Sequence, residues 1–316
     1  MAARGLGLVA LLSAGAGQCF AQAQWPARPI RVVMTSGPDA LLRVIGQKLT
    51  EAWGQQVIVD PQGGGGGMAS ASVVAKAQPD GYTLLFATAS HTMSPGFYKL
   101  PYDMARDFAP ITVAAIVPFI LIVNPSLPVK SVGDLVNLAK ARPGDLNFGS
   151  GGNGSPGHLF GEMFKSMSRT NMVHIPYKGL GFAMTDLISG QLQLTFTVGP
   201  LALPQVKSGR VRALAVTTAR RYSVVPELPT IAEAGIPGYD AMSWNGMMAP
   251  AGTPAAIIAK LHAEVVRALK APDVLERIAA LGYEPLGSSP GEFADFVKSE
   301  LLKWAKVAHE SGARLE

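Results

Sequence analysis

Short apolar runs alternate with amphipathic segments along most of the chain. Residues 30–34, 57–59 and 82–87 are apolar runs of the length and composition typical of buried strands. Between them, the segment after Asp39 and residues 68–77 are predicted to be helices, the first with apolar side chains at helical spacing. This β-α-β-α-β order predicts an α/β fold with a doubly wound, mainly parallel sheet and helices on both faces.

The middle of the chain repeats this alternation, and its C-terminal part is helical. Ser131 with Asp134 has the spacing of a helix start, and Ser155 before Pro156 predicts a capping hydroxyl at another. No repeat of fixed period and no Ser/Gly linker divides the chain, so we expect two α/β lobes joined by two or more crossings. Further strands are predicted at residues 146–149, 172–175, 192–198 and 211–216.

The first 23 residues have the pattern of a targeting segment. Arg4 gives it a positive start, the apolar stretch up to Gly17 is too short to span a bilayer, and Ala21-Gln22-Ala23 resembles a cleavage site. Residues 1–23 are therefore predicted to be a signal peptide that is removed on export. The single cysteine, Cys19, lies inside this segment, so the mature chain is expected to hold no disulfide and no cysteine nucleophile.

A second apolar run extends from Ala109 to Val123 and contains Pro118. Proline interrupts a regular hydrogen-bonded element, and the run is shorter than a membrane span requires. Two buried strands joined at Pro118 are predicted.

Composition and charge exclude several classes of protein. The chain is 48% hydrophobic and 16% charged, which excludes a disordered chain and argues against a coiled coil. The net charge is +5, but no run of four or more Lys or Arg residues exists, so nucleic acid is not a predicted partner. The histidines form no H-x-x-x-H or H-E-x-x-H pattern, so neither a metal nor a cofactor is predicted.

A glycine run from Gly63 to Gly67 lies between a predicted strand and a predicted helix. Such a loop exposes backbone N–H groups at the positive end of a helix and can hold an anion. A flexible turn without a ligand remains an alternative, as does a dinucleotide loop, although the acidic residue that the latter requires is missing. Ser90 and His91 follow a strand at the position where ligands bind in open α/β sheets.

A second glycine loop, residues 149–156, also joins a strand to a helix. The side chains of Asn153 and Ser155 and the N–H groups of the first helical turn could bind a carboxylate or a phosphate, and a helix cap without a ligand is the alternative. A hydrolase with Ser155 as nucleophile is a weaker alternative. The first glycine of G-x-S-x-G is missing, and Pro156 removes an N–H that an oxyanion hole would use.

Several ordered motifs resemble a known family. Among them are Pro79-Asp80-Gly81-Tyr82-Thr83-Leu84, Gly152-Asn153-Gly154-Ser155-x-x-His158, His174-Ile175-Pro176-Tyr177-Lys178-Gly179 and Pro229-Thr230-Ile231-Ala232-Glu233-Ala234-Gly235. With them, almost all of residues 25–316 is similar to the periplasmic substrate-binding receptors of tripartite tricarboxylate transporters, the Bug-type receptors. The resemblance implies a clamshell of the type II periplasmic binding protein kind. It also implies a receptor, not an enzyme, that binds small carboxylates between its lobes and delivers them to a membrane transporter.

The sequence departs from the family pattern in three places. The first loop, which includes Gly37 and Asp39, is shorter than usual. Before the glycine run, which Gln62 directly precedes, the arginine of the family pattern is absent. Thr197-Val198 replaces an acidic residue and an amide. Because an acid in the cleft could pair with an amino group, its absence argues against amino acids as ligands. The shortened loop keeps open a receptor-fold protein with a degenerate cleft that acts in sensing or in protein contacts.

We therefore expect a monomeric periplasmic receptor for a small organic anion, with lobe 1 at residues 24–122 plus 242–316 and lobe 2 at residues 123–241. Asp39 is expected to order its own loop rather than to touch a carboxylate. The candidate ligand-binding residues are Gly37, Asp39, Gly66, Gly67, Ser90, His91, Asn153, Gly154, Ser155 and Thr197.

Overall fold

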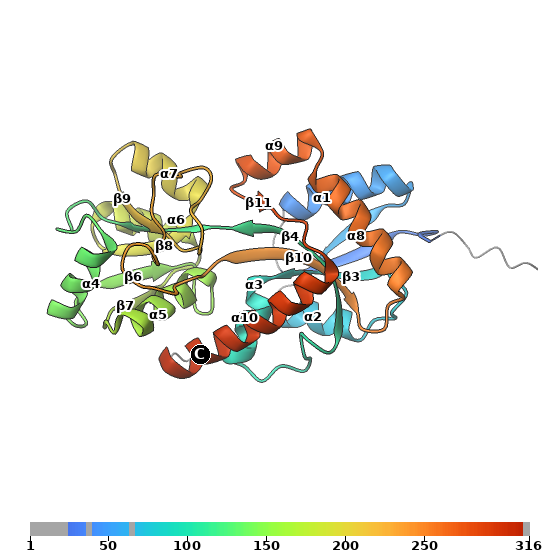
Figure 1. The fold of residues 1–316 in the computed structure, drawn as a ribbon, viewed down its shortest axis with the longest axis horizontal. Coiled ribbons are helices and arrows are strands. Elements are labelled where there is room, and N and C mark those ends of the chain that lie inside the picture. Colours follow the sequence, from blue (N-terminus) through green and yellow to red (C-terminus); the bar gives the residue numbers. More distant parts are fainter. Residues whose placement is uncertain (1–24, 36–39, 63–66, 312–316) are drawn as a thin grey trace, which may run out of the picture.

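The computed structural model describes residues 25–35, 40–62 and 67–311 and has two lobes, each built around one β-sheet (Figure 1). The strands of the first sheet are β1 (Ile30–Met34), β2 (Val57–Pro61), β3 (Thr83–Thr88), β4 (Phe108–Val117), β10 (Ser243–Pro250) and β11 (Glu284–Pro285). Their order across the sheet is β11-β4-β10-β3-β1-β2.

Helices cover both faces of the first sheet, as predicted. They are α1 (Ala40–Trp53), α2 (Met68–Ala75), α3 (Ala89–Met93), α8 (Ala255–Leu269), α9 (Pro272–Ala280) and α10 (Pro290–Ser311), with a 3₁₀ turn, η2, at Ser94–Gly96. Side chains that alternate along a strand enter different cores, because successive residues point to opposite faces. Val32 and Leu84 pack in the core formed with α1, α8 and α9, and Val33 packs in the core formed with α2 and α10.

The second sheet contains β5 (Phe119–Val123), β6 (Asn147–Ser150), β7 (Val173–Pro176), β8 (Leu194–Val198) and β9 (Arg212–Val216), in the order β7-β6-β8-β5-β9. Its helices are α4 (Val132–Ala141), α5 (Pro156–Ser168), α6 (Leu180–Ser189) and α7 (Gly199–Lys207). Helices α4 and α5 share one core with Phe148 and Phe196, and α6 and α7 share another with Ile120 and Ile122.

The chain passes from the first sheet to the second at Pro118 and returns before Ser243. Pro118 separates β4 from β5, so the prediction of two buried strands joined at this proline is confirmed. These switch points lie a few residues from the predicted lobe limits at 122–123 and 241–242. Among the described residues, no helix combines the length and the apolar composition that a membrane span requires.

The two-lobed α/β prediction is confirmed, but the expectation of mainly parallel sheets is corrected to mixed sheets. Strands β1, β2 and β3 are parallel, as are β6, β7 and β8. The returning strand β10 lies between β3 and β4 and is antiparallel to both, and β5 is antiparallel to β8 and β9. The physical reason is the double crossing, because a strand that returns from the other lobe must run opposite to one that leaves.

The C-terminal helix α10 packs on the first lobe and extends across to the second, where its last turns lie next to α5 (Figure 1). The fully buried ring of Trp304 stacks on Phe160 of α5 with centroids 5.8 Å apart. Lys303 donates to the Asp240 carbonyl, and Ser166 of α5 donates to Glu310. Helix α10 therefore connects the two lobes in addition to the crossing strands.

Candidate functional site

The strand directions place the loops of the two sheets opposite each other. Strands β3 and β4 are both antiparallel to β10, so the carboxyl end of β3 points toward the second lobe, which the chain enters after β4. Strands β6 and β8 run opposite to the entering strand β5, so their carboxyl ends point back toward the first lobe. Ligands of open α/β sheets bind outside the carboxyl ends of the strands, so the boundary between the lobes is the candidate site.

In the first lobe, Gly67 lies against the ring of His91. Gly67 precedes α2 with a φ of 94°, in the left-handed region that favours glycine. A Cβ atom added to it would lie 2.7 Å from Nε2 of His91. Both the backbone conformation and the close approach therefore require glycine at this position.

His91 is fully buried, and its ring joins two loops of the first lobe. Its Nδ1 accepts the Thr88 N–H at 3.0 Å, which places the proton of the neutral ring on Nε2. Nε2 lies 3.2 Å from the Ser70 hydroxyl, which donates to the Gly67 carbonyl. Burial lowers the pKa of His91 to about 4, so the ring is neutral at pH 7. The neighbouring Ser90 is half-buried in the first turn of α3.

In the second lobe, the loop between β6 and α5 carries three of the candidate residues. Asn153 is exposed, and Gly154 has a φ of 73°. The Gly154 N–H donates to Nδ1 of His158 at 3.1 Å, and the Gly152 N–H donates to the Ser150 hydroxyl, also at 3.1 Å. Within the described part of the chain, the N–H groups of Gly151 and Asn153 have no internal acceptor.

Two candidate hydroxyls are buried without a hydrogen-bond partner. They are Oγ of Ser155, directly before α5, and Oγ1 of Thr197, near the end of β8. Thr197 as a residue is 1% exposed. The expectation that the Ser155 hydroxyl caps α5 is wrong, because Ser155 occupies the N-cap position but its side chain makes no capping bond. By contrast, the predicted helix start at Ser131 is confirmed, since its hydroxyl accepts the Asp134 N–H at 3.1 Å.

The Ser155 side chain also lacks what a nucleophilic serine needs. No imidazole or carboxylate of the described chain is bonded to its hydroxyl, and Nδ1 of the nearby His158 is occupied by the Gly154 N–H. The candidates Gly37, Asp39 and Gly66 lie outside the described residues. Trp244 is fully buried and packs edge-to-face on Phe293 and Phe296, so it is a core residue rather than part of a cleft.

Three residues that the sequence analysis left without a role organise the second loop. Ser150 binds both Gly152 and Nε2 of His174, and His174 stacks on His158 with ring centroids 3.7 Å apart. Both histidines belong to the motifs quoted for the family resemblance, which was the available signal. Among the described residues, no three His, Cys, Asp or Glu side chains are grouped as a metal ion would require.

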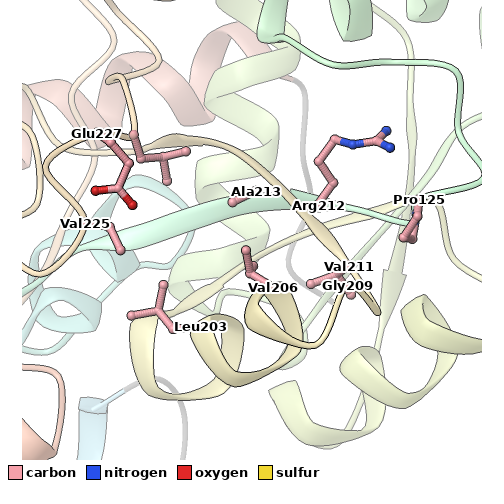
Figure 2. A pocket seen from close by; sticks show the side chains of 10 residues that line it. Pro125, Leu203, Val206, Gly209, Val211, Arg212, Ala213, Val225 and Glu227 are labelled. Carbon is pink, nitrogen blue, oxygen red and sulfur yellow. The ribbon is translucent and has the colours of Figure 1, made fainter.

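A cavity of about 370 Å³ lies elsewhere in the second lobe, between α7, β9 and the segment around residue 227 (Figure 2). Its lining is mostly apolar and includes Leu203, Val206 and Val225. Its arginine, Arg212, points away from the other labelled side chains in Figure 2 and donates to the Val129 carbonyl at 2.7 Å. This cavity contains none of the candidate residues.

Comparison with known proteins identifies the family. The model of the tripartite tricarboxylate transporter family receptor matches residues 41–313. The chain belongs to this receptor family. The BugT protein of Bordetella pertussis is 35% identical over 299 residues, covering 92% of this chain and 92% of that protein.

Solved structures of receptors are similar over nearly their full length. An R. palustris protein, Rpa4515, solved with adipate, is 39% identical with a TM-score of 0.78, and the match covers 91% of this chain and 98% of that one. MatC from Rhodopseudomonas palustris, solved with bound malate, is 31% identical with a TM-score of 0.75, covering 90% and 100%. The two-lobed fold of this chain is therefore that of the periplasmic receptors of the family.

Proposed function

We propose that this receptor captures a small organic anion with one or more carboxylates between its lobes and delivers it to a tripartite-type membrane transporter. In this proposal residues 1–23 are a signal peptide that is removed on export to the periplasm. The mature protein acts there as a monomer, without a cofactor and without catalysing a reaction. Residues 24–122 plus 242–316 and residues 123–241 are the two lobes that close on the ligand.

The pair of unpartnered hydroxyls is the observation that supports the proposal. Leaving a buried hydroxyl without a partner costs about 1–3 kcal/mol, so Ser155 and Thr197 are poorly satisfied in the protein alone. Both lie at the carboxyl edge of the second sheet, Thr197 near the end of β8 and Ser155 in the loop that carries the free N–H groups of Gly151 and Asn153. Hydroxyl and N–H groups are donors, and a ligand rich in acceptor oxygens would satisfy them together.

The same residues favour an anion over an amino acid. The side chains expected to hold the ligand, Ser90, Asn153, Ser155 and Thr197, include no carboxylate that could pair with an amino group, and Asp39 is expected to order its own loop instead. The relatives solved with adipate and malate make dicarboxylates the first class to test.

The test is a thermal-shift screen of the mature chain, residues 24–316, against mono-, di- and tricarboxylates, with amino acids included. A ligand at 100 times its dissociation constant should stabilise the protein by about 2.7 kcal/mol. We expect a shift with carboxylates and none with amino acids. A flat response to every carboxylate, or a stronger response to aspartate or glutamate than to any dicarboxylate, contradicts the proposal.

Two substitutions then locate the site. Ser155→Ala and Thr197→Val each remove one donor and should weaken binding of the best carboxylate by roughly ten- to a hundredfold, since a hydrogen bond to a charged group contributes about 1.5–3 kcal/mol. Ser189→Ala is the matched control, because that exposed hydroxyl lies at the far end of α6 and donates to the Asp186 carbonyl. Equal affinity in all three variants would place the ligand elsewhere.

A further inference from the structure

Behind the second glycine loop, two histidine rings are stacked face to face. The rings of His158 on α5 and His174 on β7 are 3.7 Å apart, with an interplanar angle of 11°. Phe148 of β6 lies beside the pair, with its ring centroid 5.0 Å from that of His174 and 6.4 Å from that of His158. His158 is 4% exposed. The stack therefore ties α5 and two strands together directly beneath the loop.

Each ring holds the loop through a different nitrogen. His158 uses Nδ1, which accepts the Gly154 N–H at 3.1 Å. His174 uses Nε2, which lies 2.7 Å from the Ser150 hydroxyl, and that hydroxyl in turn accepts the Gly152 N–H. Since a backbone N–H can only donate, the Nδ1 atom of His158 must carry no proton.

Burial, together with the charges around the stack, keeps the two rings neutral. Nε2 of His158 is 3.8 Å from Glu162, too far for a hydrogen bond, and Glu162 instead accepts two bonds from Lys165, at 2.8 and 3.0 Å. The carboxylate is thus already paired with an ammonium. Burial and the nearby Lys165 lower the pKa values of His158 and His174 to about 3 and about 4.

The arrangement divides the loop N–H groups into two alternating sets. Those of Gly152 and Gly154 are bound from within by Ser150 and His158, while those of Gly151 and Asn153 are free. In a glycine-rich loop the backbone has many accessible conformations, so such a pattern needs fixed partners to persist. The two inward bonds supply them.

We propose that His158 and His174 are positioning residues of the carboxylate site. As a neutral stacked pair they hold two loop N–H groups from within, His158 directly and His174 through the Ser150 hydroxyl. They so fix the other two N–H groups, together with the Ser155 hydroxyl, in the arrangement that receives the ligand. This inference rests on the proposed function. It adds that ligand affinity depends on one particular nitrogen of each ring, neither of which touches the ligand.

A crossed pair of substitutions tests this dependence. The side-chain oxygen of Asn can occupy the position of His Nδ1. The terminal amide of Gln can occupy the position of His Nε2. At position 158 we expect Gln to weaken adipate binding at least tenfold and Asn to recover most of that loss. At position 174 the order reverses, with Gln the better replacement and Asn the poorer. Adipate and malate are titrated calorimetrically into the mature chain and the four variants. The melting temperature of each protein is also measured without ligand.

The crossed pattern separates positioning from general stability. If the two histidines act only through general stability, the loss of affinity in each variant should follow the loss of melting temperature. Asn and Gln should then rank in the same order at position 158 as at position 174. Either result, or unchanged affinity in all four variants, overturns the inference while leaving the receptor proposal standing. If the wild-type protein binds neither adipate nor malate, the dicarboxylate proposal itself is contradicted. This outcome is seen in the wild type alone and is therefore distinct from any effect of the variants.

Discussion

Mild acid should destabilise this receptor through its buried histidines. His91 and His158 are held neutral, with burial lowering their pKa values from 6.5 to about 4 and about 3. Between these values and 6.5 the unfolded chain binds more protons than the folded one, so stability falls as the pH falls. The stabilisation is complete above pH 6.5 and decreases steadily below it.

The size of the effect follows from the pKa shifts. At pH 5, protonation of an unfolded histidine with a pKa of 6.5 favours unfolding by about 2 kcal/mol, and His91 and His158 together by about 4 kcal/mol. His174 acts in the same direction, but its ring is only partly buried, which reduces its share. Proteins are stable by about 5–15 kcal/mol, so this loss is large. Paired carboxylates such as Asp107 and Glu233 add to it only near and below their ordinary pKa values of 3.8 and 4.5.

The assay is guanidinium unfolding of the ligand-free mature chain at pH 7.5, 6.0 and 5.0. His91→Asn is the informative variant, because the Asn side-chain oxygen can accept the Thr88 N–H while the titrating group is lost. The fall in stability between pH 7.5 and 5.0 should be about 2 kcal/mol smaller in this variant. Equal stability of the wild type at both pH values, or an unchanged fall in the variant, would refute the reasoning.

Two further substitutions test packing. Gly67→Ala should cost about 1–3 kcal/mol of unfolding free energy and weaken carboxylate binding, because Gly67 has a φ of 94° and the added Cβ would meet His91. Gly54→Ala is the control for the backbone contribution alone, since Gly54 has a φ of 64° but no atom within 4 Å of the added Cβ. Trp304→Ala should cost about 3–5 kcal/mol in denaturant unfolding, whereas Leu302→Ala on the same helix, 75% exposed, should change stability by less than about 0.5 kcal/mol. Equal effects within either pair would contradict the packing argument.

The sequence alone determined the features that depend on local physics. Hydrophobic periodicity located the strands and helices, because burial of one face requires a period of two or of 3.6 residues. Pro118 divided one apolar run into two strands, and the spacing of Ser131 and Asp134 marked a helix start. The two glycine loops could be assigned to strand-to-helix junctions for the same reason.

Only the tertiary structure decided how distant segments meet. The returning strand β10 entered between β3 and β4 and made the sheets mixed, a pairing that depends on the crossings rather than on its own residues. Ser155 has the sequence pattern of a capping residue, yet its hydroxyl remains unbonded. The stack of Trp304 on Phe160 joins elements far apart in sequence, and the stack of His158 on His174 joins a helix to the strand that follows it. Such contacts form because several elements bury their apolar faces at once, and no single segment encodes that outcome.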